Sequence, residues 1–253
     1  MVEIKSKTEL DKMRESCRIV AVVLDSLREL IAPGISTWEL NEKAEEVISG
    51  YGAVAVFKNY RMNGLEPYPF SICASINDEI VHGYSSKEKV LQEGDIIGID
   101  VGVKKDGFHG DGARTYAVGR IDGETQRLMK VTELALTRAI EQCYPGNRVG
   151  DISFVIEKTA RENNLFVAEG LTGHGVGRKL HEEPIIPNTG KRGRGPRLMP
   201  GMTIAIEPMF NLGTSEVIED GWVFRTADGS NSAHFENTVL ITENEPEILT
   251  KKA

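Results

Sequence analysis

Apolar residues near the start of the chain recur at helical spacing and are interrupted by turn-forming residues. Residues 8–31 carry apolar side chains three and four positions apart and stop before Pro33-Gly34, which predicts an amphipathic helix. A second helix is predicted to start at Ser36 or Thr37 and to run to about Gly50. We therefore expect two consecutive helices at the start.

The pattern then changes to short apolar runs separated by turns, which is typical of strands. Four such runs lie within residues 53–118: Phe70–Ser75, Ile80–Gly83, Ile96–Val103 and Phe108–Val118. Helical spacing returns at Glu124 and continues to Cys143, and a further helix is predicted over residues 151–163. Strand-like runs follow to the end, so the sequence predicts an α+β fold.

Parts of this pattern occur twice, which indicates an internal repeat. Pro33-Gly34 and Pro145-Gly146 lie 112 positions apart, although such helix-stop signals can recur in any two α+β halves. A more specific match pairs Leu91-x-x-Gly94-x-x-Ile97-x-Ile99-Asp100 with Leu198-x-x-Gly201-x-x-Ile204-x-Ile206-Glu207, and both copies end in a carboxylate. A duplicated fold would bring these two strand ends together about a pseudo-twofold axis. We expect one catalytic domain, 1–253, with halves 1–120 and 121–253.

The segment from Ile96 to Tyr116 reads as a hairpin that carries two aspartates. If residues 104–107 form the loop, Asp100 lies directly opposite Asp111, with Cβ atoms about 5 Å apart on one face. Two carboxylates at that distance repel each other, so a positive charge is expected between them. A slipped register with two solvated aspartates is the alternative that the pattern leaves open.

Three further residues favour a metal site. Glu207 follows the apolar run 202–206, so its carboxylate should be partly buried, which is costly without a partner. Glu236 shares one face of a predicted strand with His234, because strand side chains alternate. His174 has glycines on both sides, which lets the backbone approach a ligand closely. A lone histidine is more often structural, but one beside four carboxylates is a candidate ligand.

The charges of these residues indicate how many ions to expect. Four ionised carboxylates are neutralised by two divalent cations, whereas one cation would leave a buried negative excess. A mostly oxygen ligand set with one imidazole and no thiolate favours Mn, Fe(II), Co or Zn. The candidate ligands are Asp100, Asp111, His174, Glu207 and Glu236.

Composition narrows the function classes. The 253 residues are 40% hydrophobic and carry a formal net charge of −8, which argues against direct, sequence-specific nucleic-acid binding. The sequence has no run of 18 apolar residues, so no membrane span is expected. Three cysteines at unrelated spacings and an amino-terminus without a secretory apolar stretch suit the reducing cytoplasm.

At these residues the sequence resembles the methionine aminopeptidases of the short bacterial type I kind, over nearly the whole chain. The motifs are Ile99-Asp100-Val101-Gly102, Gly110-Asp111-Gly112-Ala113-Arg114-Thr115, Gly173-His174-Gly175-Val176-Gly177-Arg178, Ile206-Glu207-Pro208-Met209 and Phe235-Glu236-Asn237-Thr238. The resemblance implies a pita-bread fold, in which two pseudo-symmetric α/β halves share a central curved antiparallel sheet. It also implies a cytoplasmic monomer that hydrolyses the initiator methionine from nascent proteins with a small second residue, through a metal-bridged water or hydroxide.

The resemblance also implies roles for single residues. Asp100 would bind one metal through both oxygens, Asp111 and Glu236 would bridge both ions, and His174 and Glu207 would complete the other shell. Glu207 would in addition move a proton from the attacking water. The remaining implied catalytic residues, which hydrogen-bond the scissile amide and the oxyanion, are His82 and His181.

The methionine pocket implied by the resemblance consists of Tyr68, Cys73 and Trp222. Sulfur and aromatic neighbours suit a flexible, polarisable thioether. The chain departs from the family pattern near this pocket and near the predicted metal ligands. The departures are Leu180, His234, Asn237 and the apparent insertion 61–66.

Other functions fit parts of the sequence. A proline-directed peptidase of the same fold can share all five ligands, but it usually carries an amino-terminal domain for which this chain has no room. A non-catalytic binding module could keep the fold, although it need not keep the ligands. The basic segment 191–197 also suggests transient contact with the ribosome, whereas most basic loops are simply solvated.

Overall fold

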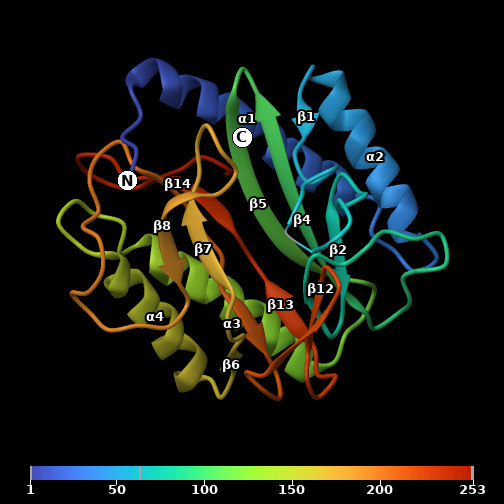
Figure 1. Ribbon diagram of the computed structural model, residues 1–253. Helices are drawn as coiled ribbons and strands as arrows, with labels where there is room; N and C mark the ends of the chain where they lie inside the picture. Colours follow the sequence, from blue (N-terminus) through green and yellow to red (C-terminus); the bar gives the residue numbers. More distant parts are fainter. Residues whose placement is uncertain (1, 63, 252–253) are drawn as a thin grey trace.

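The computed structural model describes residues 2–62 and 64–251, which form helices and antiparallel strands (Figure 1). The helices are α1 (Lys7–Arg28), α2 (Thr37–Gly50), α3 (Gly123–Ile140) and α4 (Val149–Glu162). The strands of the first half are β1 (Val54–Ala55), β2 (Cys73–Ile76), β3 (Glu79–Val81), β4 (Ile96–Lys105) and β5 (Phe108–Ala117). The strands of the second half are β6 (Phe166–Val167), β7 (Thr172–Gly175), β8 (Glu182–Pro187), β9 (Thr203–Ile206), β10 (Met209–Asn211), β11 (Val217–Asp220), β12 (Val223–Thr226), β13 (Ser232–His234), β14 (Asn237–Leu240) and β15 (Glu247–Ile248).

Capping residues set where the helices begin. The Ser36 hydroxyl accepts a hydrogen bond from the Glu39 amide at 3.3 Å, and the Glu39 carboxylate accepts one from the Ser36 amide at 2.9 Å. The predicted start of α2 is therefore confirmed. Helix α1 ends at Arg28, before its predicted end at residue 31. Among the described residues, no helix is both long and apolar enough to cross a membrane.

The predicted register of the β4–β5 hairpin is wrong by two residues. The turn contains only Asp106 and Gly107, with φ of 49° and 85°, so Lys105 is already paired with Phe108. Positive φ at both central residues is the geometry that two-residue hairpin turns prefer. Asp100 therefore lies opposite Ala113 rather than Asp111. Because the shift is an even number, both aspartates still point to one face, as diagonal neighbours.

The second half is built around a five-stranded sheet in the order β15-β14-β9-β7-β8. The strand predicted around His234 and Glu236 is interrupted, because β13 ends at His234 and β14 begins at Asn237. Thr238 of β14 joins this sheet to β5 of the first half. Its hydroxyl donates to the Asp111 carbonyl at 2.8 Å and accepts from the Asp111 amide at 3.1 Å. The two halves therefore meet at a residue beside a predicted metal ligand.

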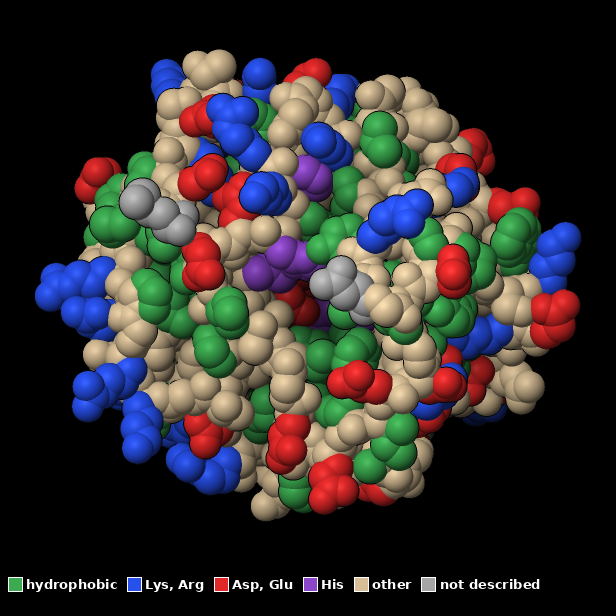
Figure 2. Space-filling model, viewed as in Figure 1, with side chains coloured by type: hydrophobic (Ala, Val, Ile, Leu, Met, Phe, Trp, Pro, Cys, Tyr) green, Lys and Arg blue, Asp and Glu red, His purple; other side chains and the backbone are tan. Residues whose placement is uncertain are grey.

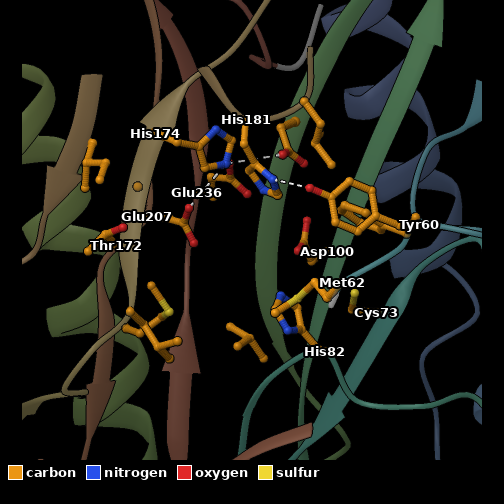
Figure 3. A pocket seen from close by; sticks show the side chains of 18 of the residues that line it. Tyr60, Met62, Cys73, His82, Asp100, Thr172, His174, His181, Glu207 and Glu236 are labelled. Atoms are coloured by element: carbon orange, nitrogen blue, oxygen red, sulfur yellow. Dashed lines mark hydrogen bonds and ion pairs between the residues drawn. The ribbon is translucent and has the colours of Figure 1, made fainter. Parts of the chain in front are cut away.

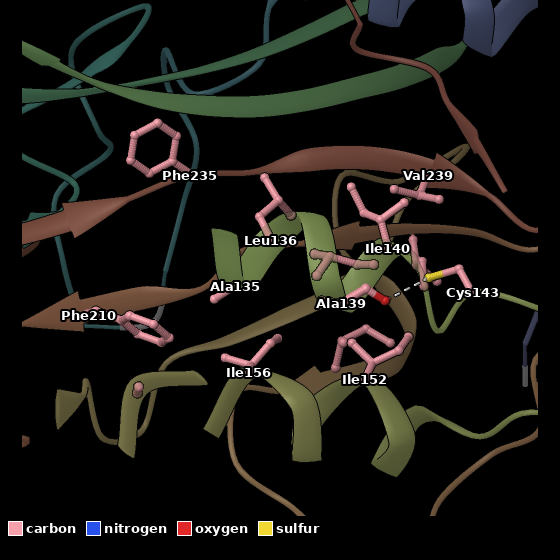
Figure 4. Packing of buried hydrophobic residues seen from close by; sticks show 14 of the residues in the cluster. Ala135, Leu136, Ala139, Ile140, Cys143, Ile152, Ile156, Phe210, Phe235 and Val239 are labelled. Atoms are coloured by element: carbon pink, nitrogen blue, oxygen red, sulfur yellow. Dashed lines mark hydrogen bonds between the residues drawn. The ribbon is translucent and has the colours of Figure 1, made fainter. Parts of the chain in front are cut away.

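Each half buries its own apolar cluster between helices and sheet. In the first half, Leu24 and Leu40 pack with Ile99 and Val101. In the second half, side chains of α3 and α4 pack against β10 and β14 (Figure 4). This leaves the opposite faces of the strands free to line a cavity between the halves. Helices α1 and α3 pass behind the strands in Figure 1.

Helix α1 approaches β5 most closely at Gly110. A Cβ atom at this position would lie 2.7 Å from the Cys17 backbone nitrogen and 2.9 Å from its Sγ. Since the nearest of these contacts is with backbone, relief would require α1 to move. Gly110 therefore sets the distance between the helix and the strand that carries Asp111.

We predict that Gly110→Ala lowers the free energy of unfolding by roughly 1–3 kcal/mol, because the added methyl group overpacks the interface of α1 and β5. Gly50→Ala is the matched control, since a Cβ at the end of α2 would meet nothing within 4 Å. The control should be neutral or slightly stabilising. Urea unfolding of both variants measures this, and equal midpoints would contradict the proposed close contact.

Candidate active site

A cavity of about 820 Å³ opens between the two halves. Figure 2 shows it as a hollow bordered by histidine side chains, with acidic side chains inside. Its wall includes every residue that the sequence analysis singled out for metal binding, catalysis or the methionine pocket. These residues are Tyr68, Cys73, His82, Asp100, Asp111, His174, His181, Glu207, Trp222 and Glu236.

Five different segments bring the candidate metal ligands together (Figure 3). Asp100 lies on β4 and Asp111 on β5, while His174 lies on β7. Glu207 directly follows β9, and Glu236 occupies the interruption between β13 and β14. The pairing of His174 with Ala205 and of Asn237 with Ile206 explains why the three segments of the second half converge.

The ligand atoms lie at distances that one or more cations can span. One oxygen of Asp111, one oxygen of Glu236 and a ring nitrogen of His174 all lie within 4.8 Å of one another. His174 Nε2 is 3.7 Å from Asp111 Oδ2 and 3.6 Å from Glu207 Oε1. These separations are longer than good hydrogen bonds, and they leave room for an ion between the groups.

Burial makes the carboxylates electrostatically unfavourable as anions. It raises the pKa of Asp100 to about 7 and that of Glu207 to about 8. Burial, followed by the charges of neighbouring carboxylates, raises the pKa of Asp111 and of Glu236 well above the usual range. Burial also lowers the pKa of His174 to about 3, so its imidazole is a neutral potential ligand.

Several buried atoms of the cluster lack a hydrogen-bond partner among the described residues. They are Asp100 Oδ1, Asp111 Oδ1, Glu236 Oε1 and His234 Nε2. Buried polar atoms without partners are rare in folded proteins, and they often mark the place of an ion. The donor set of carboxylate oxygens and one imidazole fits divalent cations.

Glycines beside His174 have a different role from the one predicted. A Cβ at Gly173 would lie 2.4 Å from the Ala205 carbonyl oxygen, and one at Gly175 would lie 2.3 Å from the Glu183 carbonyl oxygen. The two glycines therefore allow the neighbouring strands, rather than a ligand, to approach the backbone. The result is that β7, the strand that carries His174, is closely packed between β8 and β9.

Arg114 supports Glu236 from behind, and the sequence analysis did not single it out. Its guanidinium donates to the Glu236 carbonyl, to the Ala113 carbonyl at 2.7 Å and to Asn237 Oδ1 at 2.7 Å. Arg114 lies on the face of β5 opposite Asp111, because side chains alternate along a strand. The sequence signal for this role was the presence of Arg114 in the motif around Asp111. Its partners Glu236 and Asn237 are distant in sequence, so the motif alone did not identify them.

The two non-ligand histidines lie on different sides of the cavity (Figure 3). His82 has a φ of 58°, and its buried Nδ1 has no hydrogen-bond partner among the described residues. Burial lowers the pKa of His82 to about 4, so the ring is neutral. His181 lies against His174, with ring centroids 4.4 Å apart, and its Nδ1 is 2.7 Å from the Tyr60 hydroxyl.

The predicted methionine pocket forms one buried cluster of Tyr68, Cys73 and Trp222. The Tyr68 hydroxyl donates to the Gly83 carbonyl at 2.8 Å, and Trp222 Nε1 donates to the Glu66 carbonyl at 2.7 Å. With their polar atoms paired in this way, both rings present apolar surfaces to the cavity. Cys73 is paired with Asp100 in the sheet, so the apolar pocket adjoins the carboxylates directly.

Most of the sequence departures also lie at the site. Leu180 lines the cavity, and so does Met62 of the insertion 61–66, of which Asn63 lies outside the described residues. His234 is buried with Nε2 3.4 Å from Glu207 Oε2. Tyr60 lines the cavity too, although the sequence analysis did not single it out.

Comparison with known proteins places the chain in a family. Residues 11–243 match the model of metallopeptidase family M24. Methionine aminopeptidase of Clostridium perfringens is 46% identical over 252 residues, which cover 99% of each protein. Methionine aminopeptidase 1 of Bacillus subtilis is 45% identical over 253 residues, which cover 99% of this chain and 100% of that protein.

Solved structures agree with these matches. The crystal structure of methionine aminopeptidase from Thermotoga maritima has a TM-score of 0.96 at 44% identity and covers 100% of both chains. Prolidase from Pyrococcus furiosus has a TM-score of 0.77 at 25% identity, and the match covers 99% of this chain but 66% of the prolidase. The predicted α+β pita-bread fold and the predicted family resemblance are confirmed. The chain belongs to metallopeptidase family M24 and, within it, to the methionine aminopeptidases.

Proposed function

We propose that this chain is a metal-dependent aminopeptidase that removes the initiator methionine from nascent proteins and peptides with a small second residue. The main support for this proposal is that one cavity contains both a charged cluster and an apolar pocket. A cluster of buried carboxylates with His174 adjoins an apolar pocket that contains Cys73 and Trp222. Membership of a metallopeptidase family supports divalent metal use, and the relatives named methionine aminopeptidase support the substrate.

We assign two divalent ions to Asp100, Asp111, His174, Glu207 and Glu236, and we expect Co, Mn, Fe(II) or Zn. Four carboxylates balance the charge of two such ions, and the buried oxygens without partners support cation binding at this site. Divalent ions held there would polarise the peptide carbonyl and lower the pKa of water. The proposed catalytic unit is a single domain, residues 1–253, acting as a monomer in the cytoplasm.

The substrate methionine is proposed to lie against Tyr68, Cys73 and Trp222. Burial raises the pKa of the Cys73 thiol well above its usual value, so the thiol stays neutral beside an apolar side chain. The aromatic rings of Tyr68 and Trp222 lie 5.5 Å apart at a steep angle, which gives the pocket two fixed walls. Contacts between sulfur and aromatic rings favour a thioether there.

The residues around the scissile bond have complementary proposed tasks. His82 and His181 donate hydrogen bonds to the amide and to the oxygen on which negative charge develops. The Glu207 carboxylate takes a proton from water and passes it to the leaving amine. His234 Nε2 lies 3.4 Å from Glu207 Oε2 and packs beside that carboxylate.

Peptide cleavage separates this function from the proline-directed alternative. We predict efficient hydrolysis of Met-Gly-X peptides and little hydrolysis of X-Pro peptides, because the pocket suits a thioether. Chelation should abolish the activity and stepwise return of a divalent ion should restore it. Release of free methionine measures both, and efficient cleavage of X-Pro peptides alone would overturn the proposal.

Asp111→Asn tests the metal assignment. We predict that activity falls by on the order of 100-fold or more and that metal affinity is lost, since a carboxamide is a weaker ligand. The metal-free variant should unfold no more easily than the metal-free wild type, because a buried negative charge has been removed. Asp106→Asn, in the exposed turn of the same hairpin, is the control. Calorimetric titration of both variants measures the affinity, and unchanged metal binding by Asp111→Asn would refute the assignment.

Transient ribosome contact is a separate proposal for the basic loop 191–197. The loop is exposed, yet backbone hydrogen bonds hold it against the start of α4, including one from the Gly150 amide to the Arg194 carbonyl at 2.9 Å. A fixed basic surface on a chain of net charge −8 suits phosphate contacts. We predict salt-sensitive co-sedimentation with ribosomes that Arg192→Glu with Arg194→Glu weakens. Unchanged sedimentation of the double variant would remove this proposal.

A further inference from the structure

Tyr60 and His181 make a hydrogen bond across the mouth of the cavity. The Tyr60 hydroxyl oxygen lies 2.7 Å from His181 Nδ1, and the two rings meet edge to face with centroids 5.5 Å apart. Tyr60 follows β1 in the first half, whereas His181 precedes β8 in the second half. Figure 3 shows the bond, with the His181 ring between Tyr60 and His174. The contact therefore links the two halves at the proposed reaction site.

This bond decides which nitrogen of His181 carries the proton. A neutral imidazole has one N–H donor and one acceptor nitrogen. Burial raises the pKa of Tyr60, which keeps its hydroxyl protonated and able to donate. If the hydroxyl donates to Nδ1, the proton of His181 must lie on Nε2.

The opposite arrangement leaves the Tyr60 hydroxyl hydrogen without an acceptor among the described residues. If Nδ1–H donated to the Tyr60 oxygen, the hydroxyl hydrogen would need another acceptor. Among the described residues, His181 Nδ1 is the one hydrogen-bond partner of that hydroxyl. Nε2 would then face the cavity as a lone pair, which repels a carbonyl oxygen. The hydroxyl as donor avoids both problems.

We propose that Tyr60 is a positioning residue, which fixes His181 in the tautomer whose Nε2–H donates to the carbonyl oxygen of the scissile peptide. The inference rests on the aminopeptidase function proposed above. The buried Nδ1 of His82, by contrast, lacks a hydrogen-bond partner among the described residues. A donor held in advance toward a developing negative charge stabilises the transition state more than one that must first reorient.

Tyr60→Phe removes the hydroxyl and keeps the ring contacts with His181 and Trp222. We expect kcat on Met-Gly-X to fall by about tenfold, the effect of losing one fixed hydrogen bond. KM and metal affinity should change less than about twofold, because the pocket and the metal ligands are intact. Tyr116→Phe is the control. It removes a hydroxyl that donates to the Leu24 carbonyl at 3.1 Å, away from the cavity, and it should leave kcat unchanged.

Nitrogen NMR of ¹⁵N-histidine-labelled protein reads the tautomer directly, without any activity. Zinc is the ion to use, since its filled d shell is diamagnetic. The wild type should show the His181 proton on Nε2, and Tyr60→Phe should show a mixture of tautomers. In a His181→Asn background, Tyr60→Phe should have no further effect on kcat, because Tyr60 acts through His181.

Three results would overturn the proposal: a wild-type proton on Nδ1, an unchanged tautomer in Tyr60→Phe, or an unchanged kcat despite a changed tautomer. Failure of the aminopeptidase function itself is distinguishable. In that case the wild type would not cleave Met-Gly-X, while the NMR spectrum would still report the tautomer.

Discussion

Burial of four neighbouring carboxylates in one cavity is the constraint on which the rest of this structure depends. Asp100, Asp111, Glu207 and Glu236 face one cavity, and burial raises the pKa of each. Such a cluster is unfavourable for folding unless cations or protons neutralise it. The fold must therefore hold these side chains together against an electrostatic cost. The metal binding that we propose follows from the same cost, because divalent cations would neutralise the carboxylates.

Hydrogen bonds to the backbone around Asp111 and Glu236 hold the carboxylates together against this cost. Thr238 ties the backbone of Asp111 to the second half, while Arg114 holds the carbonyl of Glu236 at the interruption between β13 and β14. The Glu236 amide donates to the Ala113 carbonyl at 2.9 Å. Since these bonds come from the backbone and from the opposite face of β5, they leave the carboxylate oxygens free for ions. The proposed methionine pocket adjoins them through β2, where Cys73 is paired with Asp100 of β4, so the candidate metal ligands and this pocket are built partly on one sheet.

Patterns local in sequence predicted the α+β class and the candidate metal ligands, whereas the family resemblance supplied the pita-bread fold, the non-ligand histidines and the pocket residues. Alternation along β4 and β5 placed Asp100 and Asp111 on one face even though the register was wrong, because the error was an even number of residues. The length of the turn could not be read from the Lys104 to Gly107 segment, since a four-residue loop and a two-residue turn both fit its composition. The proposed roles of the site residues come from the family resemblance, and local pattern alone would not have assigned them.

Long-range contacts explain what the sequence did not predict. At the break at Phe235-Glu236, Arg114 donates to the Glu236 carbonyl and to Asn237 Oδ1, which lie more than 100 positions away in sequence. The bond between Tyr60 and His181 likewise joins the two halves. No periodicity within either segment marks such pairs, because the pairing exists only once β5, β8 and β14 are assembled. Interpreting these residues therefore required the structure.

Unfolding of the chelated protein as a function of pH tests the account most directly. Between about pH 7.5 and 8 the histidines with lowered pKa are largely neutral in both states, because this range lies above their ordinary pKa of 6.5, whereas the buried carboxyls, including Glu207 near 8, retain protons only in the folded state. A group with a raised folded pKa loses stabilisation as pH rises toward that value, so the free energy of unfolding should fall across this window. A divalent ion should remove or reverse the slope, because it binds deprotonated ligands. A metal-free free energy of unfolding that stays constant or rises with pH would contradict the buried carboxylate cluster.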